Sequence, residues 1–177
     1  MKKLLLLSFL FITSISIAAS TAVFDKLHQA NAPSPQSILQ KIENEYAQKA
    51  VIVEFELEFE HGKTTYEVTL YQAEKHRFIE LLVDQQGKLI ELEYDAPEID
   101  EQEEIAAATL MSQKGLTMQG LVAQLDSPAH QYLLEAQLEQ DMGITYMVAT
   151  FVTEQGRHKK AIDLATGKDL PLLRWGN

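Results

Sequence analysis

The stretch from residue 51 to residue 60, Val-Ile-Val-Glu-Phe-Glu-Leu-Glu-Phe-Glu, constrains the fold of this chain more than any other. Apolar and acidic side chains alternate along it, and successive side chains of a strand point to opposite faces of a sheet. The alternation predicts a long strand with one buried face, made of Val51, Val53, Phe55, Leu57 and Phe59. The other face is acidic, and we take its four carboxylates as the candidate binding face: Glu54, Glu56, Glu58 and Glu60.

Two interpretations of these four glutamates stay open. They can steer a basic partner onto the sheet, because complementary charge accelerates association. They can equally form a solvated face, since a run of like charges usually only faces water. The whole chain has 15 basic and 26 acidic residues and a net charge of -11, which repels the phosphates of nucleic acids and of anionic membranes. We therefore expect a protein or peptide partner and no nucleic acid.

The N-terminus has the pattern of a secretory signal peptide over residues 1–22. Met1-Lys2-Lys3 is a short basic start, an apolar run follows it, and small residues surround the expected cleavage point between Ala19 and Val23. A membrane anchor is disfavoured, because the run is short for a span and no basic stop-transfer cluster follows it. The chain has no cysteine to carry a lipid or a disulfide. We expect a periplasmic or secreted protein with no stable membrane anchor after signal cleavage.

A helix and an antiparallel meander are predicted for the first half, residues 34–95. Ser34 is a good helix N-cap, Pro35 suits the first helical position, and apolar residues then recur at helical spacing through Gln48. The strand over 51–60 should be followed by one containing Tyr66-Glu67-Val68, a third over 78–83 and a fourth over 88–94. The residues expected beneath this helix are Phe55, Leu57, Tyr66, Val68 and Leu70.

Residues 96–115 read as an acidic linker with a short helix from Ile105 to Lys114. The acidic start of this helix, the lysine near its end and Gly115 after it all suit a helix dipole and a helix C-cap. A calcium loop is the alternative, but the acidic residues do not follow the spacing of such loops. We therefore expect a solvated linker and no cofactor.

The second half, residues 116–174, repeats the order of the first. Thr117 is a second N-cap, ahead of Leu121 and Leu125, and an alternating stretch over 132–139 follows. Thr145-Tyr146-Met147-Val148 matches Thr65-Tyr66-Glu67-Val68 in position. The residues expected beneath the second helix are Leu134, Leu138, Tyr146 and Val148.

A turn of similar sequence ends a strand in each half. The first is Val83-Asp84-Gln85-Gln86-Gly87-Lys88 and the second is Ile162-Asp163-Leu164-Ala165-Thr166-Gly167-Lys168. Each glycine can adopt the positive φ that such a turn needs, and each aspartate can bond the turn amides. The fold class expected from these patterns is α+β, with two repeated units, each a helix packed on an antiparallel meander of three to four strands.

This order of elements and turns resembles the PepSY domain, present twice. The residues that carry the resemblance are the tyrosine-containing second strand and the turn residues Asp84, Gly87, Asp163, Thr166 and Gly167. The first turn departs from the family pattern because Gln86 stands where the family has threonine. PepSY units occur in propeptides of thermolysin-like metallopeptidases, where they inhibit or assist the enzyme, and as free exported proteins. The resemblance therefore implies a binding or peptidase-modulating protein.

No catalytic pattern is present in the sequence. The five histidines are not in zinc-binding spacing, and there is no nucleophile elbow, phosphate loop or dinucleotide fingerprint. We therefore expect a non-enzyme without a catalytic residue or a metal site. Two functions stay open: a module that binds a protein or peptide, including a peptidase, and a periplasmic accessory or sensor module that binds a small cation or ligand.

Overall fold

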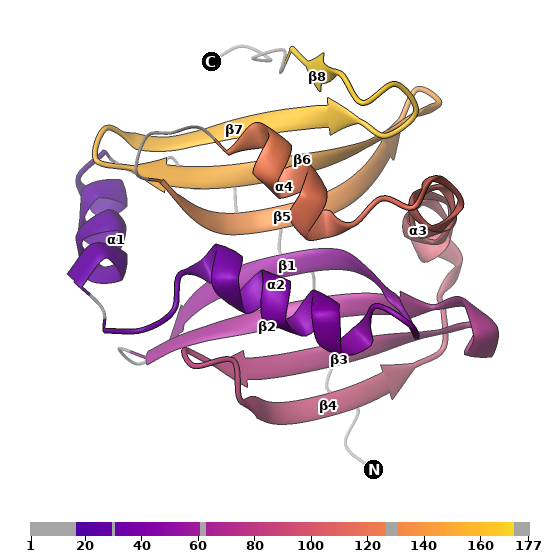
Figure 1. Cartoon of the computed structure of the whole chain (residues 1–177), viewed down its shortest axis with the longest axis horizontal. Coiled ribbons are helices and arrows are strands. Elements are labelled where there is room, and N and C mark those ends of the chain that lie inside the picture. The colour runs from indigo at the N-terminus through magenta and orange to yellow at the C-terminus, as the bar shows by residue number, and fades with distance from the viewer. Residues whose placement is uncertain (1–16, 30, 61–62, 127–130, 172–177) are drawn as a thin grey trace.

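The computed structural model describes residues 17–29, 31–60, 63–126 and 131–171 (Figure 1). Eight strands form one antiparallel sheet in the order β4-β3-β2-β1-β5-β6-β7-β8. The strands are β1 (Val51–Glu60), β2 (Lys63–Gln72), β3 (Arg77–Asp84), β4 (Leu89–Asp95), β5 (Tyr132–Asp141), β6 (Ile144–Thr153), β7 (Gly156–Asp163) and β8 (Asp169–Leu170). The helices are α1 (Ile17–Gln29), α2 (Pro35–Tyr46), α3 (Gln102–Lys114) and α4 (Met118–Leu125).

The expected fold class, two repeated helix-on-meander units, is wrong. Strand β1 pairs with β5 in an antiparallel register that aligns Glu54 with Gln137, Phe55 with Ala136 and Glu56 with Glu135. This pairing merges the strands of both halves into one sheet. The physical reason is that an isolated meander would leave the long edge of β1 unpaired, whereas pairing satisfies its backbone groups and joins the two apolar surfaces.

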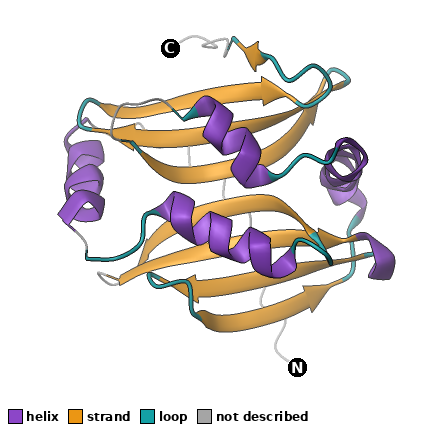
Figure 2. Cartoon of the chain, in the orientation of Figure 1, coloured by secondary structure: helices purple, strands orange, loops and turns teal. Residues whose placement is uncertain are grey.

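Helices α2 and α4 lie across the same face of the sheet, and they begin where the sequence predicts (Figure 2). The Ser34 hydroxyl accepts a hydrogen bond from the amide of Ser37, and the Thr117 hydroxyl accepts one from the amide of Gly120. The apolar side chains of both helices are buried on the sheet: Ile38, Leu39, Ile42, Met118, Leu121, Val122 and Leu125. We call this side of the sheet the helix-covered face.

The other two helices stand at the ends of the sheet (Figure 1). Helix α3 contacts β1 and β5, and its small residues Ala107 and Ala108 are buried, which lets the helix approach closely. It begins earlier than predicted, directly after a short 3-10 helix at Ile99–Glu101. Helix α1 contacts β6 and β7, and the sequence analysis did not predict it.

Helix α1 overlaps the predicted signal peptide. The expected cleavage point between Ala19 and Val23 falls inside it, while residues 1–16 lie outside the described residues. Phe24, just after that point, is 2% exposed, and its ring lies 5.5 Å from that of Tyr132. The segment that follows the cleavage point therefore contributes to the core. Within the described part of the chain, no helix is long and apolar enough to cross a membrane.

The strand phase is right from Phe55 onward in the first half and is wrong for β6 in the second. All five residues expected beneath α2 are buried there. Leu134, Leu138 and Val148 are buried too, but Val148 pairs with Gln137 on the side of the sheet opposite α4. However, Leu138 pairs with Met147, so Met147 shares its face, whereas Tyr146 pairs with Glu139 and Asp163 on the opposite face. A shift of one residue moves every side chain of a strand to the other face, so matching Tyr146 to Tyr66 assigned the wrong phase to β6.

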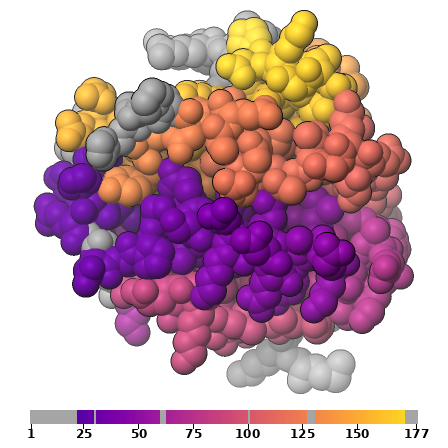
Figure 3. Space-filling view, viewed as in Figure 1, coloured from indigo at the N-terminus to yellow at the C-terminus, as the bar shows by residue number. Residues whose placement is uncertain are grey.

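Glu43 links the two helices of the helix-covered face. Its carboxylate accepts hydrogen bonds from the amides of Met118, at 2.7 Å, and Gln119, at 3.1 Å, at the start of α4. Burial raises the pKa of Glu43, while these two hydrogen bonds lower it. In the space-filling view, the segments of α2 and α4 meet along a continuous surface (Figure 3). A side chain of the first half thus caps a helix of the second.

We expect Glu43→Gln to lower the free energy of unfolding in urea by about 1 kcal/mol, because the charge at the helix N-terminus is lost. Glu45→Gln is the matched control, since Glu45 is an exposed residue of the same helix. It should change the unfolding free energy by less than about 0.5 kcal/mol. Equal effects of the two substitutions would show that the carboxylate does not join the helices.

Candidate functional site: the acidic face of the sheet

The side of the sheet opposite α2 and α4 collects carboxylates from five adjacent strands. The pairing registers align them in two rows that run across the sheet. The first row runs Glu135, Glu56, Glu67, Leu82, Glu91 from β5 to β4, and the second runs Gln137, Glu54, Thr69, Glu80, Glu93. We call the carboxylates of these rows, together with Asp95, the acidic face.

Glu56 lies at the centre of this arrangement, directly opposite Glu67 on one side and Glu135 on the other. Like charges directly opposite each other destabilise a sheet. Among the described residues, no lysine or arginine lies within ion-pair distance of Glu56 or Glu67. Glu135 does have partners: Lys159 lies 4.0 Å away, and the Thr150 hydroxyl donates to it at 2.9 Å. The negative charges of Glu56 and Glu67 at the centre of the face are therefore not neutralised by an ion pair within the described residues.

Glu54 is half-buried beside the N-terminal part of α3. Burial first, and then the charges of Glu56, Glu135, Glu104 and Glu67, raise the pKa of Glu54 to about 7. It lines a pocket of about 150 Å³ together with Val53, Thr69, Phe78, Glu80, Glu101, Glu104 and Gln137. Burial and neighbouring carboxylates also raise the pKa values of Glu56 and Glu80. These groups are held where ionisation is costly.

Three carboxylates of the acidic face approach one another near the outer edge of the sheet. One oxygen each of Glu80, Glu93 and Asp95 lies within 4.8 Å of the others. Carboxylate oxygens are the ligands that calcium prefers in proteins. Glu93 and Asp95 are exposed and Glu80 is half-buried, so this group is the part of the face that could hold a cation.

The predicted glutamate stripe is only part of this surface. Glu56 is exposed, Glu54 and Glu58 are half-buried, and the side chain of Glu60 lies outside the described residues. The predicted alternation fails at the start of β1, where a bulge lies between Ile52 and Glu54 and both Ile52 and Val53 are buried. The bulge adds one residue to the strand, so Ile52 and not Val53 shares the face of Phe55.

Most of the acidic face was not predicted from the sequence. Glu67, Glu80, Glu93 and Glu135 each come from a different strand. A signal was present, because each of them alternates with apolar residues in its own strand. What the sequence could not supply was the register that sets Glu67 and Glu135 against Glu56.

The two aspartate–glycine turns do not lie on the acidic face. The Asp84 carboxylate accepts hydrogen bonds from the amides of Gln86, at 2.8 Å, and Lys88, at 2.9 Å. These hydrogen bonds are the largest cause that lowers the pKa of Asp84. The Asp163 carboxylate accepts from the amides of Ala165 and Thr166, at 2.6 and 3.0 Å. Both aspartates serve their own turns, as their residue types predict.

The two turns differ in length and surroundings. The amide of Gly87 bonds the carbonyl of Asp84, three residues earlier, while that of Gly167 bonds the carbonyl of Asp163, four residues earlier. Gly87 and Gly167 have φ values of +66° and +67°. A Cβ atom on Gly87 would lie 3.2 Å from Ile38 and Lys41, whereas one on Gly167 would meet nothing within 4 Å. The first turn is therefore packed against α2 at its glycine, whereas the second is open at Gly167 and is held instead by Lys114 of α3, which donates to the carbonyl of Ala165 at 2.6 Å.

The described histidines do not converge on one site. His28 bonds the hydroxyl of Tyr132, His76 that of Tyr71, and His158 the side chain of Gln131. Burial lowers the pKa of His158. His61 and His130 lie outside the described residues.

Comparison with known proteins identifies no family. No family model matches the chain, and no curated protein matches it. A solved structure with similarity is that of "a putative lipoprotein" from Clostridium difficile 630. It is 17% identical over 82% of this chain and 95% of that one, with a TM-score of 0.43. A likeness of this size supports no conclusion about fold or function.

The raised pKa of Glu54 predicts a pH dependence of stability. A carboxyl whose pKa is higher in the folded state stabilises the fold at low pH, and this contribution is lost as pH rises through the folded pKa, about 7 for Glu54. We therefore expect the difference in unfolding free energy, Glu54→Gln minus wild type, to increase by roughly 1–3 kcal/mol between about pH 5 and pH 8.

Urea unfolding at several pH values measures this difference. The comparison isolates Glu54, because the opposite contribution of His158, whose pKa is lowered, is common to both proteins. Glu45→Gln, on the far side of the sheet, should run parallel to the wild type. Parallel curves for Glu54→Gln as well would mean that Glu54 is not held where ionisation is costly.

Proposed function

We propose that this chain is an exported binding protein, without catalytic activity, that holds a basic protein or peptide segment against the acidic face. The observation that carries the proposal is Glu56, placed directly between Glu67 and Glu135. Cross-strand pairs of like charge lower the stability of the sheet. A cationic partner would offset this repulsion. Binding would therefore be favoured by the same three carboxylates that destabilise the free sheet.

The geometry favours this over a face that only keeps the protein soluble. Carboxylates that serve solubility need to be in water, whereas Glu54 and Glu80 are half-buried with raised pKa values. Their neighbours in the pocket include further carboxylates, from Glu101 and Glu104. A lysine or arginine entering this region would find several acceptors and a less screened field than at an open surface.

We also propose that the protein is exported and that its partner is a peptidase whose activity it modulates. The basic, apolar and small-residue pattern of residues 1–22 supports export to the periplasm or the medium. The PepSY resemblance of the turn residues supports a peptidase as partner, and inhibition assays with a thermolysin-like metallopeptidase test that narrower role. Activity of the peptidase unchanged by the purified protein would remove the peptidase role while leaving the acidic face to be tested separately.

A second candidate function is the binding of a small cation. The three oxygens of Glu80, Glu93 and Asp95 within 4.8 Å of one another favour it. Calorimetry with calcium distinguishes the two functions. If calcium binds in a way that Glu80→Gln abolishes and a basic peptide does not bind, the cation function replaces the proposed one.

Titration with octalysine tests the acidic face directly. We expect binding that weakens about tenfold between about 20 mM and about 200 mM sodium chloride, since exposed charges are increasingly screened. The double substitution of Glu67 and Glu93 by glutamine should weaken binding at low salt, because both residues are exposed on the face.

The control has the same change in net charge elsewhere. Glu45 on α2 and Glu154 in the turn between β6 and β7 are exposed and lie outside the acidic face. Their replacement by glutamine should leave the affinity for octalysine nearly unchanged. Equal weakening by both double variants, or no binding of octalysine at low salt, would contradict the proposed function.

A further inference from the structure

Strand β4 is an edge of the sheet. Among the described residues it pairs only with β3, and it ends the strand order. In an antiparallel sheet, alternate backbone amide and carbonyl groups of an edge strand point away from the neighbouring strand. The seven residues of β4 therefore offer a row of hydrogen-bonding groups to an added strand.

The two sides of β4 differ sharply in chemistry. Glu91, Glu93 and Asp95 pair with Leu82, Glu80 and Phe78 and lie on the acidic face. Leu89, Leu92 and Tyr94 pair with Val83, Leu81 and Ile79 on the helix-covered face. Leu89 is 48% exposed and Tyr94 is 52% exposed. The edge is thus acidic on one side and apolar on the other.

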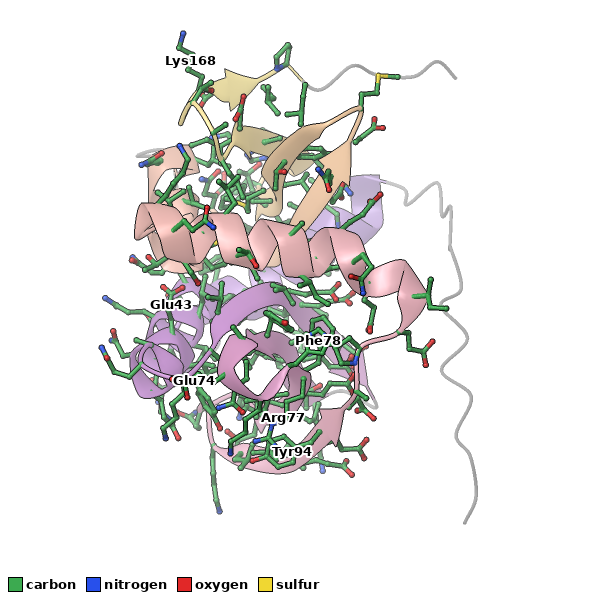
Figure 4. All side chains as sticks on the ribbon, turned by 90° about the vertical axis from the view of Figure 1, so that its right-hand side faces the viewer. Glu43, Glu74, Arg77, Phe78, Tyr94 and Lys168 are labelled. Carbon is green, nitrogen blue, oxygen red and sulfur yellow. The ribbon has the colours of Figure 1, made fainter. Side chains whose placement is uncertain are left out.

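Tyr94 is held in place although it is exposed. The guanidinium carbon of Arg77 lies 3.7 Å from the centre of its ring, and the Arg77 Nε–H donates to the side chain of Gln72 at 2.8 Å. Figure 4 shows Arg77 and Tyr94 next to each other at this end of the molecule. The Arg77 guanidinium therefore holds the aromatic ring against the sheet at this edge.

Sheet edges are usually guarded against such additions by charged side chains, especially lysine, or by proline, shortness or a bulge. The opposite edge, β8, has two residues and is followed by Pro171. Strand β4 contains neither lysine nor proline, and its register shift lies at its start, opposite Leu82 and Val83. The remaining part, from Glu91 to Asp95, pairs regularly with β3, and its carboxylates disfavour an added strand unless that strand is basic.

We propose that β4 binds an extended basic segment of a partner protein as a ninth strand, in which lysine or arginine alternates with apolar residues. The alternate basic side chains would lie on the acidic face beside Glu91, Glu93 and Asp95. The apolar side chains between them would lie beside Leu89 and Tyr94. This inference rests on the proposed function and extends it, because it names a second place, at the β4 end of the acidic face and three strands from Glu56, and the conformation in which a basic segment binds there.

Charge complementarity selects this occupant over a second copy of the chain. Two β4 strands paired with each other would bring Glu91, Glu93 and Asp95 of both copies onto one face, without a basic residue in either strand. Like charges directly opposite are destabilising in a sheet. A basic strand reverses that repulsion into attraction.

Two octapeptides of equal composition test the proposal on the purified protein. One alternates lysine and valine, and the other has four lysines followed by four valines. Both carry the same charge, but only the first places all its lysines on one face of a strand. We expect the alternating peptide to bind about tenfold more tightly, and to slow amide hydrogen exchange in residues 89–95.

Matched variants locate the peptide on the sheet. The edge pair of substitutions is Glu91→Gln with Glu93→Gln, on β4. The central pair is Glu56→Gln with Glu67→Gln, which makes the same change in charge on β1 and β2. All four residues are exposed. The edge pair should weaken binding of the alternating peptide more than the central pair does, with unfolding in urea little changed for both.

The outcomes separate this inference from the proposed function. Equal affinity for the two peptides without protection of residues 89–95 would overturn strand addition and leave charge-driven binding by the face intact. Failure of both peptides to bind would overturn both proposals. A concentration-dependent dimer in sedimentation that excludes the alternating peptide would overturn the inference in favour of a second copy.

Discussion

Everything else in this structure depends on the pairing of β1 with β5. Three aligned residue pairs join the halves, and they turn two meanders into one eight-stranded sheet. Phe55 and Ala136, the middle pair, are both fully buried beneath the helices. The same register sets Glu56 against Glu135 on the opposite face. One interaction therefore creates both the continuous core and the concentration of charge.

The apolar side chains of the helix-covered face and the carboxylates of the acidic face contribute to stability with opposite sign. On the helix-covered face, burial of apolar side chains stabilises the fold, and Glu43 adds a link between α2 and α4. On the acidic face, carboxylates oppose one another across the strands and burial raises the pKa of Glu54. The core can sustain these unfavourable charges, and the fold leaves them available for the basic partner that we propose.

Local features of the fold could be predicted from the sequence, and long-range ones could not. Ser34, Pro35 and Thr117 identified the starts of α2 and α4 because capping depends on neighbouring residues. The alternation from Phe55 to Leu57 identified the buried face of β1. The bulge at Val53 and the phase of Tyr146 were missed, because both depend on the strand opposite. The acidic face required the partners of Glu56, which lie 11 and 79 residues away in the chain.

A carboxyl NMR titration of the glutamates, with and without bound octalysine, shows whether the acidic face is the binding surface. We expect Glu54 to titrate near pH 7 in the free protein, and its midpoint to fall when the peptide binds, because nearby cations favour the ionised form. A midpoint near 4.5 in the free protein, the value of an unperturbed glutamate, would contradict the electrostatics of the face. A raised midpoint that does not move on peptide binding would contradict its role as the binding surface.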